Sequence, residues 1–245
     1  MKILKKFLSG LAFLISISIT TNSYAETIIR PSKLETRFYQ MGFRNSSTGE
    51  FASVFSSTDG QLVDLSSPNS IQTLAENTQL TNSGTFDQMY VLVSNTVSIS
   101  GDTSNGCYIK GGNYSYSNGA IPATTQNSSL SGIAIVTETG FGGVAATTSD
   151  LDSYKTNPAV TSSVNGKAVN NLTLYLVNKT NRNPGSGGPY NRYLYLGDLQ
   201  TPINLTTEKN GTLWIDADTS ESVAIETDCT EFYWSNTKFG LSVEQ

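Results

Sequence analysis

Short apolar segments recur along the whole chain, roughly every 8–15 residues, and turn-forming residues separate them. Ser, Thr and Asn account for 32, 30 and 21 of the 245 residues, and these side chains compete with a helical backbone for hydrogen bonds. Several segments alternate with the period of a β-strand, so that Tyr39, Met41 and Phe43 should share one face. The pattern predicts an all-β fold, an antiparallel β-sandwich of about 11–12 short strands.

The first 25 residues have the pattern of a secretory signal peptide. Three lysines precede an apolar run over residues 7–19, and Ser23–Ala25 match a small-residue cleavage site. The run is shorter than the roughly 20 residues that a membrane-spanning helix needs. We therefore expect cleavage before Glu26 and a soluble mature chain without stable membrane insertion. Its expected location is secreted or at the cell surface, with the periplasm as the alternative.

The composition excludes several activities. The chain has no His, which removes Ser-His-Asp and Cys-His catalytic systems and imidazole metal ligands. The formal net charge is -5, and loss of the three signal-peptide lysines leaves 12 basic and 20 acidic residues, a charge of -8. Such a chain repels nucleic acid. The sequence therefore predicts a protein without enzymatic activity and without a cofactor other than, at most, Ca²⁺.

The two cysteines constrain the domain organisation. Cys107 and Cys229 both lie in the part expected to be exported, where an oxidising compartment favours a disulfide; two free thiols are the alternative. The bridge would tie the middle of the chain to its end. We therefore expect residues 26–245 to form a single domain, with a boundary near 120–130 as the alternative.

About a quarter of the chain, residues 36–101, carries a further pattern. An opening strand and a short apolar triplet precede a glycine-aromatic turn that leads into a long strand: Thr36–Phe43, Val63–Leu65, Ser83–Met89, Val91–Val93 and Ile99–Gly101. This arrangement resembles secreted bacterial prealbumin-like β-sandwich domains, exported proteins of largely unknown role. The resemblance implies a fold and brings no catalytic residues with it.

Two groups of side chains are candidates for ligand binding. The segment 216–221 places carboxylates at alternate positions, as Ca²⁺ prefers, but it lacks the later Gly and Glu of an EF-hand; an acidic turn between strands is the alternative. Two tyrosine groups could stack on sugar rings, with ordinary packing as the alternative. The candidates are Asp216, Asp218 and Glu221 for Ca²⁺, and Tyr108, Tyr114, Tyr116, Tyr190, Tyr193 and Tyr195 for a glycan.

These observations predict an exported, non-catalytic structural or adhesive subunit at the cell surface or outside the cell. Residues 26–33 could pair with the sheet edge of a neighbouring copy, whereas in a monomer Thr27–Arg30 would fold back on their own sheet. Pro31 separates this segment from the next strand. One alternative function is a carbohydrate-binding module. Another is a hydrolase that uses two of the carboxylates of Asp198, Glu208, Asp216, Asp218, Glu221, Glu226, Asp228 and Glu231.

Overall fold

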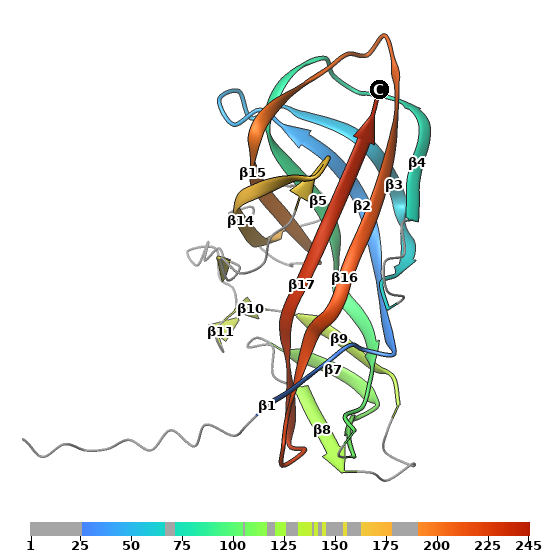
Figure 1. Cartoon of the computed structure of the whole chain (residues 1–245), viewed down its shortest axis with the longest axis vertical. Coiled ribbons are helices and arrows are strands. Elements are labelled where there is room, and N and C mark those ends of the chain that lie inside the picture. The colour runs from blue at the N-terminus through green and yellow to red at the C-terminus, as the bar shows by residue number, and fades with distance from the viewer. Residues whose placement is uncertain are drawn as a thin grey trace, which may run out of the picture.

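All regular structure in the described part of the computed structural model is β-sheet (Figure 1). The structure describes residues 26–66, 72–104, 106–116, 121–125, 132–138, 140–141, 144–145, 154–155, 163–177 and 191–245. The predicted signal peptide, residues 1–25, lies outside this described part, and so does Tyr190. Within the same ranges, no helix has the length and apolar character needed to cross a membrane.

The described residues form seventeen strands, fifteen of them in one sheet and two, β10 and β11, in a separate hairpin. The strands are β1 (Glu26–Ile29), β2 (Lys33–Arg44), β3 (Phe51–Asp64), β4 (Gln72–Gln79), β5 (Gly84–Ser100), β6 (Cys107–Ile109), β7 (Gly112–Tyr116), β8 (Ile121–Thr125), β9 (Ala134–Glu138), β10 (Gly140–Phe141), β11 (Val144–Ala145), β12 (Tyr154–Lys155), β13 (Ser163–Val164), β14 (Lys167–Val177), β15 (Arg192–Leu205), β16 (Asn210–Glu226) and β17 (Glu231–Glu244).

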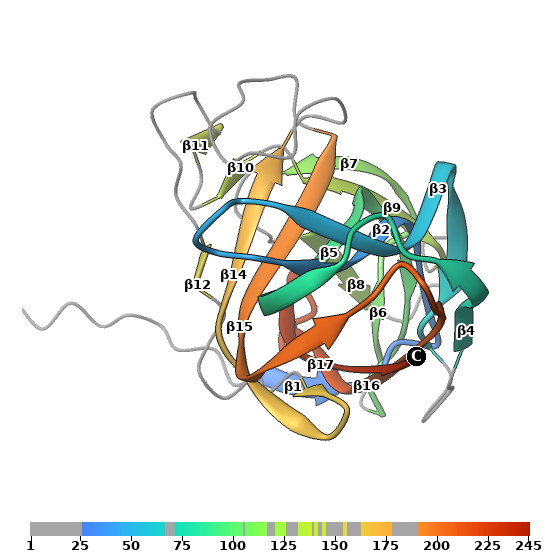
Figure 2. The same cartoon turned by 90° about the horizontal axis from the view of Figure 1, so that it is seen from above.

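The large sheet curls into a nearly closed cylinder. Its strand order is β1-β16-β17-β13-β14-β15-β5-β2-β3, and β4 pairs with β16 while packing beside β3, which brings the two ends of the order together (Figure 2). Pairing is antiparallel except between β13 and β17 and between β7 and β9. The predicted all-β antiparallel fold is confirmed, and its opposite walls face each other across one core.

The main core fills the inside of the cylinder, and a second apolar cluster covers the outside of β5, β14 and β15. Residues 89–95 of β5 are buried without interruption, because both faces of this strand are covered. Each large side chain buried in this way contributes about 1.5–3 kcal/mol. The outer cluster consists of Tyr90, Leu92, Val177, Leu194 and Leu196, against which Tyr39, Phe51 and Tyr175 pack.

A β-bulge in β2 changes the face on which Tyr39 lies. Met41 and Phe43 belong to the main core as predicted, but Tyr39 packs on the outer cluster. The register of β2 shifts between Phe38 and Gln40 against both β3 and β5. The extra residue interrupts the alternation, so the prediction that Tyr39 shares a face with Met41 is wrong.

Tyr90 of β5 crosses the neighbouring strand β2 above a glycine. Gly42 lies opposite both Tyr90 and Ser53 of β3 in the ladder, and the Tyr90 hydroxyl and Ser53 Oγ share a hydrogen bond of 2.5 Å. A Cβ built at Gly42 would collide with the backbone carbonyl of Ala52. The ring of Phe51 meets that of Tyr90 edge-on, with centroids 4.9 Å apart. Gly42 therefore allows the backbones of β2 and β3 to approach closely at the point where the Tyr90 hydroxyl reaches Ser53.

The predicted disulfide between Cys107 and Cys229 is confirmed, with the two Cα atoms 5.0 Å apart. Cys107 begins β6, and Cys229 lies in the turn between β16 and β17. The bridge fastens this long hairpin, at the lower end of the molecule in Figure 1, to the β6–β8 pair. Its sequence separation of 122 residues makes it a cross-link between distant parts of the fold.

Candidate functional site

The first strand, β1, occupies one edge of the large sheet. It begins at Glu26, the residue expected at the mature N-terminus, and pairs antiparallel with β16 through four residue pairs, from Glu26 opposite Glu226 to Ile29 opposite Val223. Within the described residues β16 is its only ladder partner. The expectation that a monomer folds this segment back on its own sheet is therefore met.

The two isoleucines of β1 have different surroundings. Ile29 packs against the main core beside Gly101. Its Cδ1 is so close to this glycine that a Cβ added at position 101 would lie only 3.1 Å away. Ile28 lies opposite Ala224 on the outer face, and 53% of its surface is exposed. Four ladder pairs at about 1 kcal/mol per net hydrogen bond, with one partly buried Ile, hold β1 in place. The strand is thus attached by only a few contacts.

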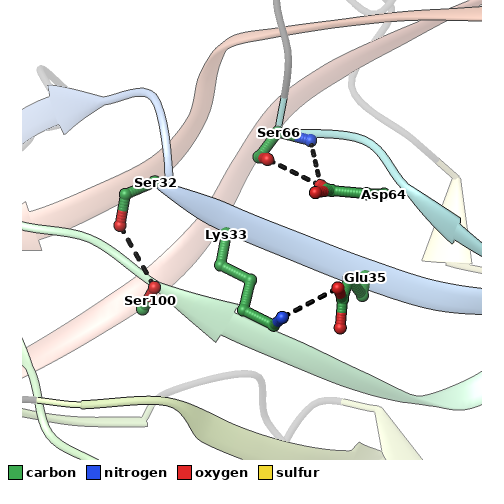
Figure 3. Close-up of polar contacts among 6 residues, drawn as sticks. All are labelled: Ser32, Lys33, Glu35, Asp64, Ser66 and Ser100. Atoms are coloured by element: carbon green, nitrogen blue, oxygen red, sulfur yellow. Dashed lines mark hydrogen bonds and ion pairs between the residues drawn. The ribbon is translucent and has the colours of Figure 1, made fainter.

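A proline and a serine held by hydrogen bonds separate β1 from β2. Pro31 cannot donate a ladder hydrogen bond, and Ser32 follows it with its N–H on the Ser100 carbonyl at 2.9 Å. Figure 3 shows the hydroxyls of Ser32 and Ser100 bonded at 3.1 Å, and Lys33 Nζ paired with Glu35 Oε1 at 2.7 Å. These contacts fix the start of β2, so that β1 can change direction only at residues 30–31.

The C-terminal end of β3 lies beside the start of β2 and is held by hydrogen bonds within its own turn. Figure 3 also shows Asp64 Oδ1 accepting hydrogen bonds from the Ser66 N–H at 2.9 Å and from its hydroxyl at 2.6 Å. Asp64 lies opposite Glu35 in the ladder. Lys33 and Ser66 therefore compensate two carboxylates that would otherwise repel each other across the strands.

The strand β16 offers its edge to two short strands. β4 pairs with Asn210–Ile215, and β1 pairs with Val223–Glu226. Between them the Thr219 hydroxyl donates to the Leu65 carbonyl at 3.0 Å. Removal of β1 would open only the edge at Val223–Glu226 and uncover the core beside Val223 and Ile225, both fully buried. The acceptor for β1 is thus a defined four-residue segment.

The disulfide lies directly beside this acceptor segment. The Cys229 N–H donates to the Glu226 carbonyl at 2.9 Å, and Cys107 Sγ lies 3.6 Å from the same oxygen. The Thr230 hydroxyl reaches Glu226 Oε2 at 2.5 Å. The end of β16 therefore keeps its shape independently of β1.

A second surface with functional side chains lies on the outside of β2, β5, β14 and β15. Two arginines lie over aromatic rings there: Arg192 Cζ is 3.5 Å from the centroid of Tyr39, and Arg44 Cζ is 5.7 Å from that of Phe51. Guanidinium groups are attracted to the faces of such rings. We call these two pairs, with Tyr175, the outer arginine face.

A chain of hydrogen bonds runs across the strands at the Arg44 end of this face. Arg44 Nη1 donates to Gln88 Oε1 at 2.5 Å, and Gln88 Nε2 donates to Asp198 Oδ1 at 2.8 Å. Asn171 Nδ2 donates to the other oxygen of Asp198 at 2.7 Å. All four side chains therefore have hydrogen-bond partners within the protein, and Asp198 accepts hydrogen bonds on both of its carboxylate oxygens.

The structure does not gather the candidate tyrosines into one platform. Tyr193 and Tyr195 point into the cylinder and pack against the main core, with ring centroids 6.4 Å apart, and burial raises the pKa of Tyr195 to about 12. Tyr114 also packs against this core, and its hydroxyl donates to the carbonyls of Lys110 and Gly111. Tyr108 lies in β6, Tyr116 ends β7, and Tyr190 is outside the described residues.

The candidate calcium ligands lie within one strand. Asp216, Asp218 and Glu221 are part of β16, whose register shifts between Asp218 and Glu221 against β17. Asp218 Oδ1 accepts from the Ser220 N–H at 3.0 Å and from its hydroxyl at 2.7 Å. Across the described ranges, no three Cys, Asp or Glu side chains form a group that could hold a metal ion. Calcium binding stays a prediction.

The outer arginine face was not predicted from the sequence. The run of buried residues in β5 indicates cover on both faces of that strand, and this signal is readable as an uninterrupted apolar segment at Met89–Val93. The aromatic rings that cover β5 could not be predicted from the sequence, because the bulge in β2 moves Tyr39 to the outside.

A comparison with known proteins found no matching family model, curated protein or solved structure.

Proposed function

We propose that the mature chain is an exported, non-catalytic structural or adhesive subunit whose copies join by exchanging β1. The observation that carries this proposal is the attachment of β1, a four-residue ladder at a sheet edge, joined to the rest of the fold through Pro31. The β1 strand of one copy would take the same place on the Val223–Glu226 edge of another.

The energetics favour exchange over the addition of a new strand. Every contact of β1 in the monomer is recreated between copies, so the free-energy difference is small apart from the entropy of association. Ile29 would pack against the main core of the neighbouring copy beside Gly101, as it does in its own. The disulfide keeps the acceptor segment in shape while β1 is away.

Light scattering and electron microscopy of the mature protein with its native disulfide test this proposal. We expect concentration-dependent oligomers or fibres, and we expect deletion of residues 26–30 to abolish them while the β-type circular dichroism persists. A chain that stays monomeric at high concentration would contradict the proposal. Turnover of polysaccharide substrates by the purified protein would instead favour the carboxylate hydrolase.

Two substitutions in β1 separate exchange from simple edge-to-edge pairing. Ile29→Ser removes the side chain that packs in the core, so we expect it to weaken assembly strongly. Ile28→Ser changes a side chain that is exposed in the same strand, and assembly by exchange should survive it. Loss of assembly in Ile28→Ser alone would show that copies join through the outer surface of β1 instead.

A further inference from the structure

Arg192 reaches across a whole strand to meet Tyr39. The strands β15 and β2 are separated by β5, and the β5 residue opposite Arg192 is Ser94, whose small side chain is buried. The guanidinium of Arg192 therefore has room to lie over the Tyr39 ring, 3.5 Å from its centroid. The bulge in β2 that turns Tyr39 outward makes this contact possible.

The guanidinium of Arg192 is half-buried and keeps hydrogen-bonding capacity. Nη1 donates to the backbone carbonyl of Asn191 at 2.6 Å, whereas a guanidinium has five N–H groups. Burial lowers the pKa of Arg192, and the interaction with Tyr39 opposes this effect. Within the described residues, the ion pair of the structure joins Lys33 to Glu35, and no carboxylate pairs with Arg192.

Apolar and aromatic side chains of the outer cluster lie next to the guanidinium of Arg192. Tyr175 of β14 is opposite Leu194, two residues along β15 from Arg192, and such diagonal neighbours are about 7–8 Å apart. Tyr175 and Tyr39 both pack, partly exposed, on the outer cluster. A sugar ring that rests on an aromatic face near Arg192 can therefore place a carboxylate against the guanidinium, which binds that group in a two-pronged manner.

We propose that the Arg192 end of the outer arginine face binds a carboxylate-bearing sugar, with Arg192 on the carboxylate and Tyr39 and Tyr175 beside the ring. The expected charge of the partner follows from the guanidinium of Arg192, which pairs with no carboxylate among the described residues, in a chain whose net charge is negative. The Arg44 end differs because Gln88 and Asp198 already engage it. The proposal does not depend on the exchange of β1.

The test is a titration of the isotope-labelled mature protein, followed by NMR, with two matched pairs of sugars. One pair is trigalacturonate and its methyl ester, and the other is sialyllactose and its methyl ester. We expect the carboxylate member of at least one pair to bind about tenfold or more tightly than its neutral partner, to shift the Arg192 side-chain resonance, and to weaken as salt rises. The pair that responds identifies the source of the acid group. Equal binding within both pairs, or no binding, would overturn the proposal.

Variants of Arg192 separate a binding role from a structural one. Arg192→Gln should lose about tenfold or more in affinity, and Arg192→Lys, which keeps the charge without the planar fork, should recover only part of it. Lys167→Gln removes one exposed positive charge at the start of β14 and should bind as the unmodified chain does. Unchanged binding by a folded Arg192→Gln, checked by circular dichroism, would refute the role of Arg192.

Discussion

Ile28 of β1 lies directly opposite Ala224 of β16, and 53% of its surface remains exposed although the strand is paired. The neighbouring Ile29 faces the other way and packs, partly buried, against the main core. A strand with this division is fixed to its sheet by one side chain and a short ladder. The same attachment serves within one copy or between two, and this equivalence underlies the proposed assembly.

Export should leave Glu26 at the N-terminus, since the predicted cleavage site directly precedes β1. Mass spectrometry of the mature protein from the extracellular or periplasmic fraction measures this end directly. A mature chain that retains residues 7–19 would refute the signal-peptide prediction and would place additional residues before β1.

The disulfide should contribute strongly to stability. It closes a loop with a sequence separation of 122 residues, for which the chain-entropy model gives about 5 kcal/mol. We expect reduction, or the double substitution Cys107→Ser and Cys229→Ser, to lower the melting temperature markedly in calorimetry. Equal melting temperatures with and without reductant would show that the hairpin end of β16 and β17 is held by packing alone.

Gly42 should be among the least replaceable residues. Gly42→Ala places a methyl group against the Ala52 carbonyl in a backbone contact that cannot move easily, and we expect a loss of about 3 kcal/mol in urea unfolding. Tyr90→Phe removes only the hydroxyl bonded to Ser53 and should cost about 1–2 kcal/mol. A Gly42→Ala variant as stable as the parent would disprove the close approach of β2 and β3 at Gly42.

Tyr195 makes stability fall at alkaline pH. Burial raises its pKa from 10.0 to about 12 in the folded protein, so between these values the unfolded chain releases a proton that the folded chain retains. The stabilisation of the folded state is therefore full below pH 10 and declines as pH rises toward 12. Tyr195→Phe should show a smaller loss over this range in urea unfolding at stepped pH. Identical alkaline profiles would contradict the raised pKa of Tyr195.

The sequence predicted the fold better than the faces of its strands. Alternation in β2 placed Met41 and Phe43 on one face, and both residues do lie in the main core. The acidic turn between strands, which was the alternative to a Ca²⁺ site at 216–221, does not form: β16 continues over 17 residues, and a bulge near Asp218 absorbs the irregular sequence. Bulges depend on the partner strands, so neither this one nor the one that turns Tyr39 outward is visible in the local pattern.

The β1 edge and the outer arginine face also differ in how far the sequence predicts them. The N-terminal edge strand was predictable because the predicted cleavage site, Ile28, Ile29 and Pro31 are neighbours in the sequence. The contact of Arg192 with Tyr39 joins strands that are far apart in the sequence, and it depends on the strand order and on the small Ser94 between them. Such a contact can be identified only once the sheet is assembled.

A cysteine pair at positions 28 and 224 tests the central claim most directly. We would introduce Ile28→Cys and Ala224→Cys together, mix ¹⁴N- and ¹⁵N-labelled mature chains before assembly, oxidise the assembled fraction and analyse the cross-linked peptides by mass spectrometry. Because these two positions face each other in the ladder, exchange predicts peptides that combine the two labels, together with covalent multimers on non-reducing gels. Ile28→Cys alone is the control. Cross-links that join positions 28 and 224 only within single chains, in a fraction that is nevertheless assembled, would contradict the exchange of β1.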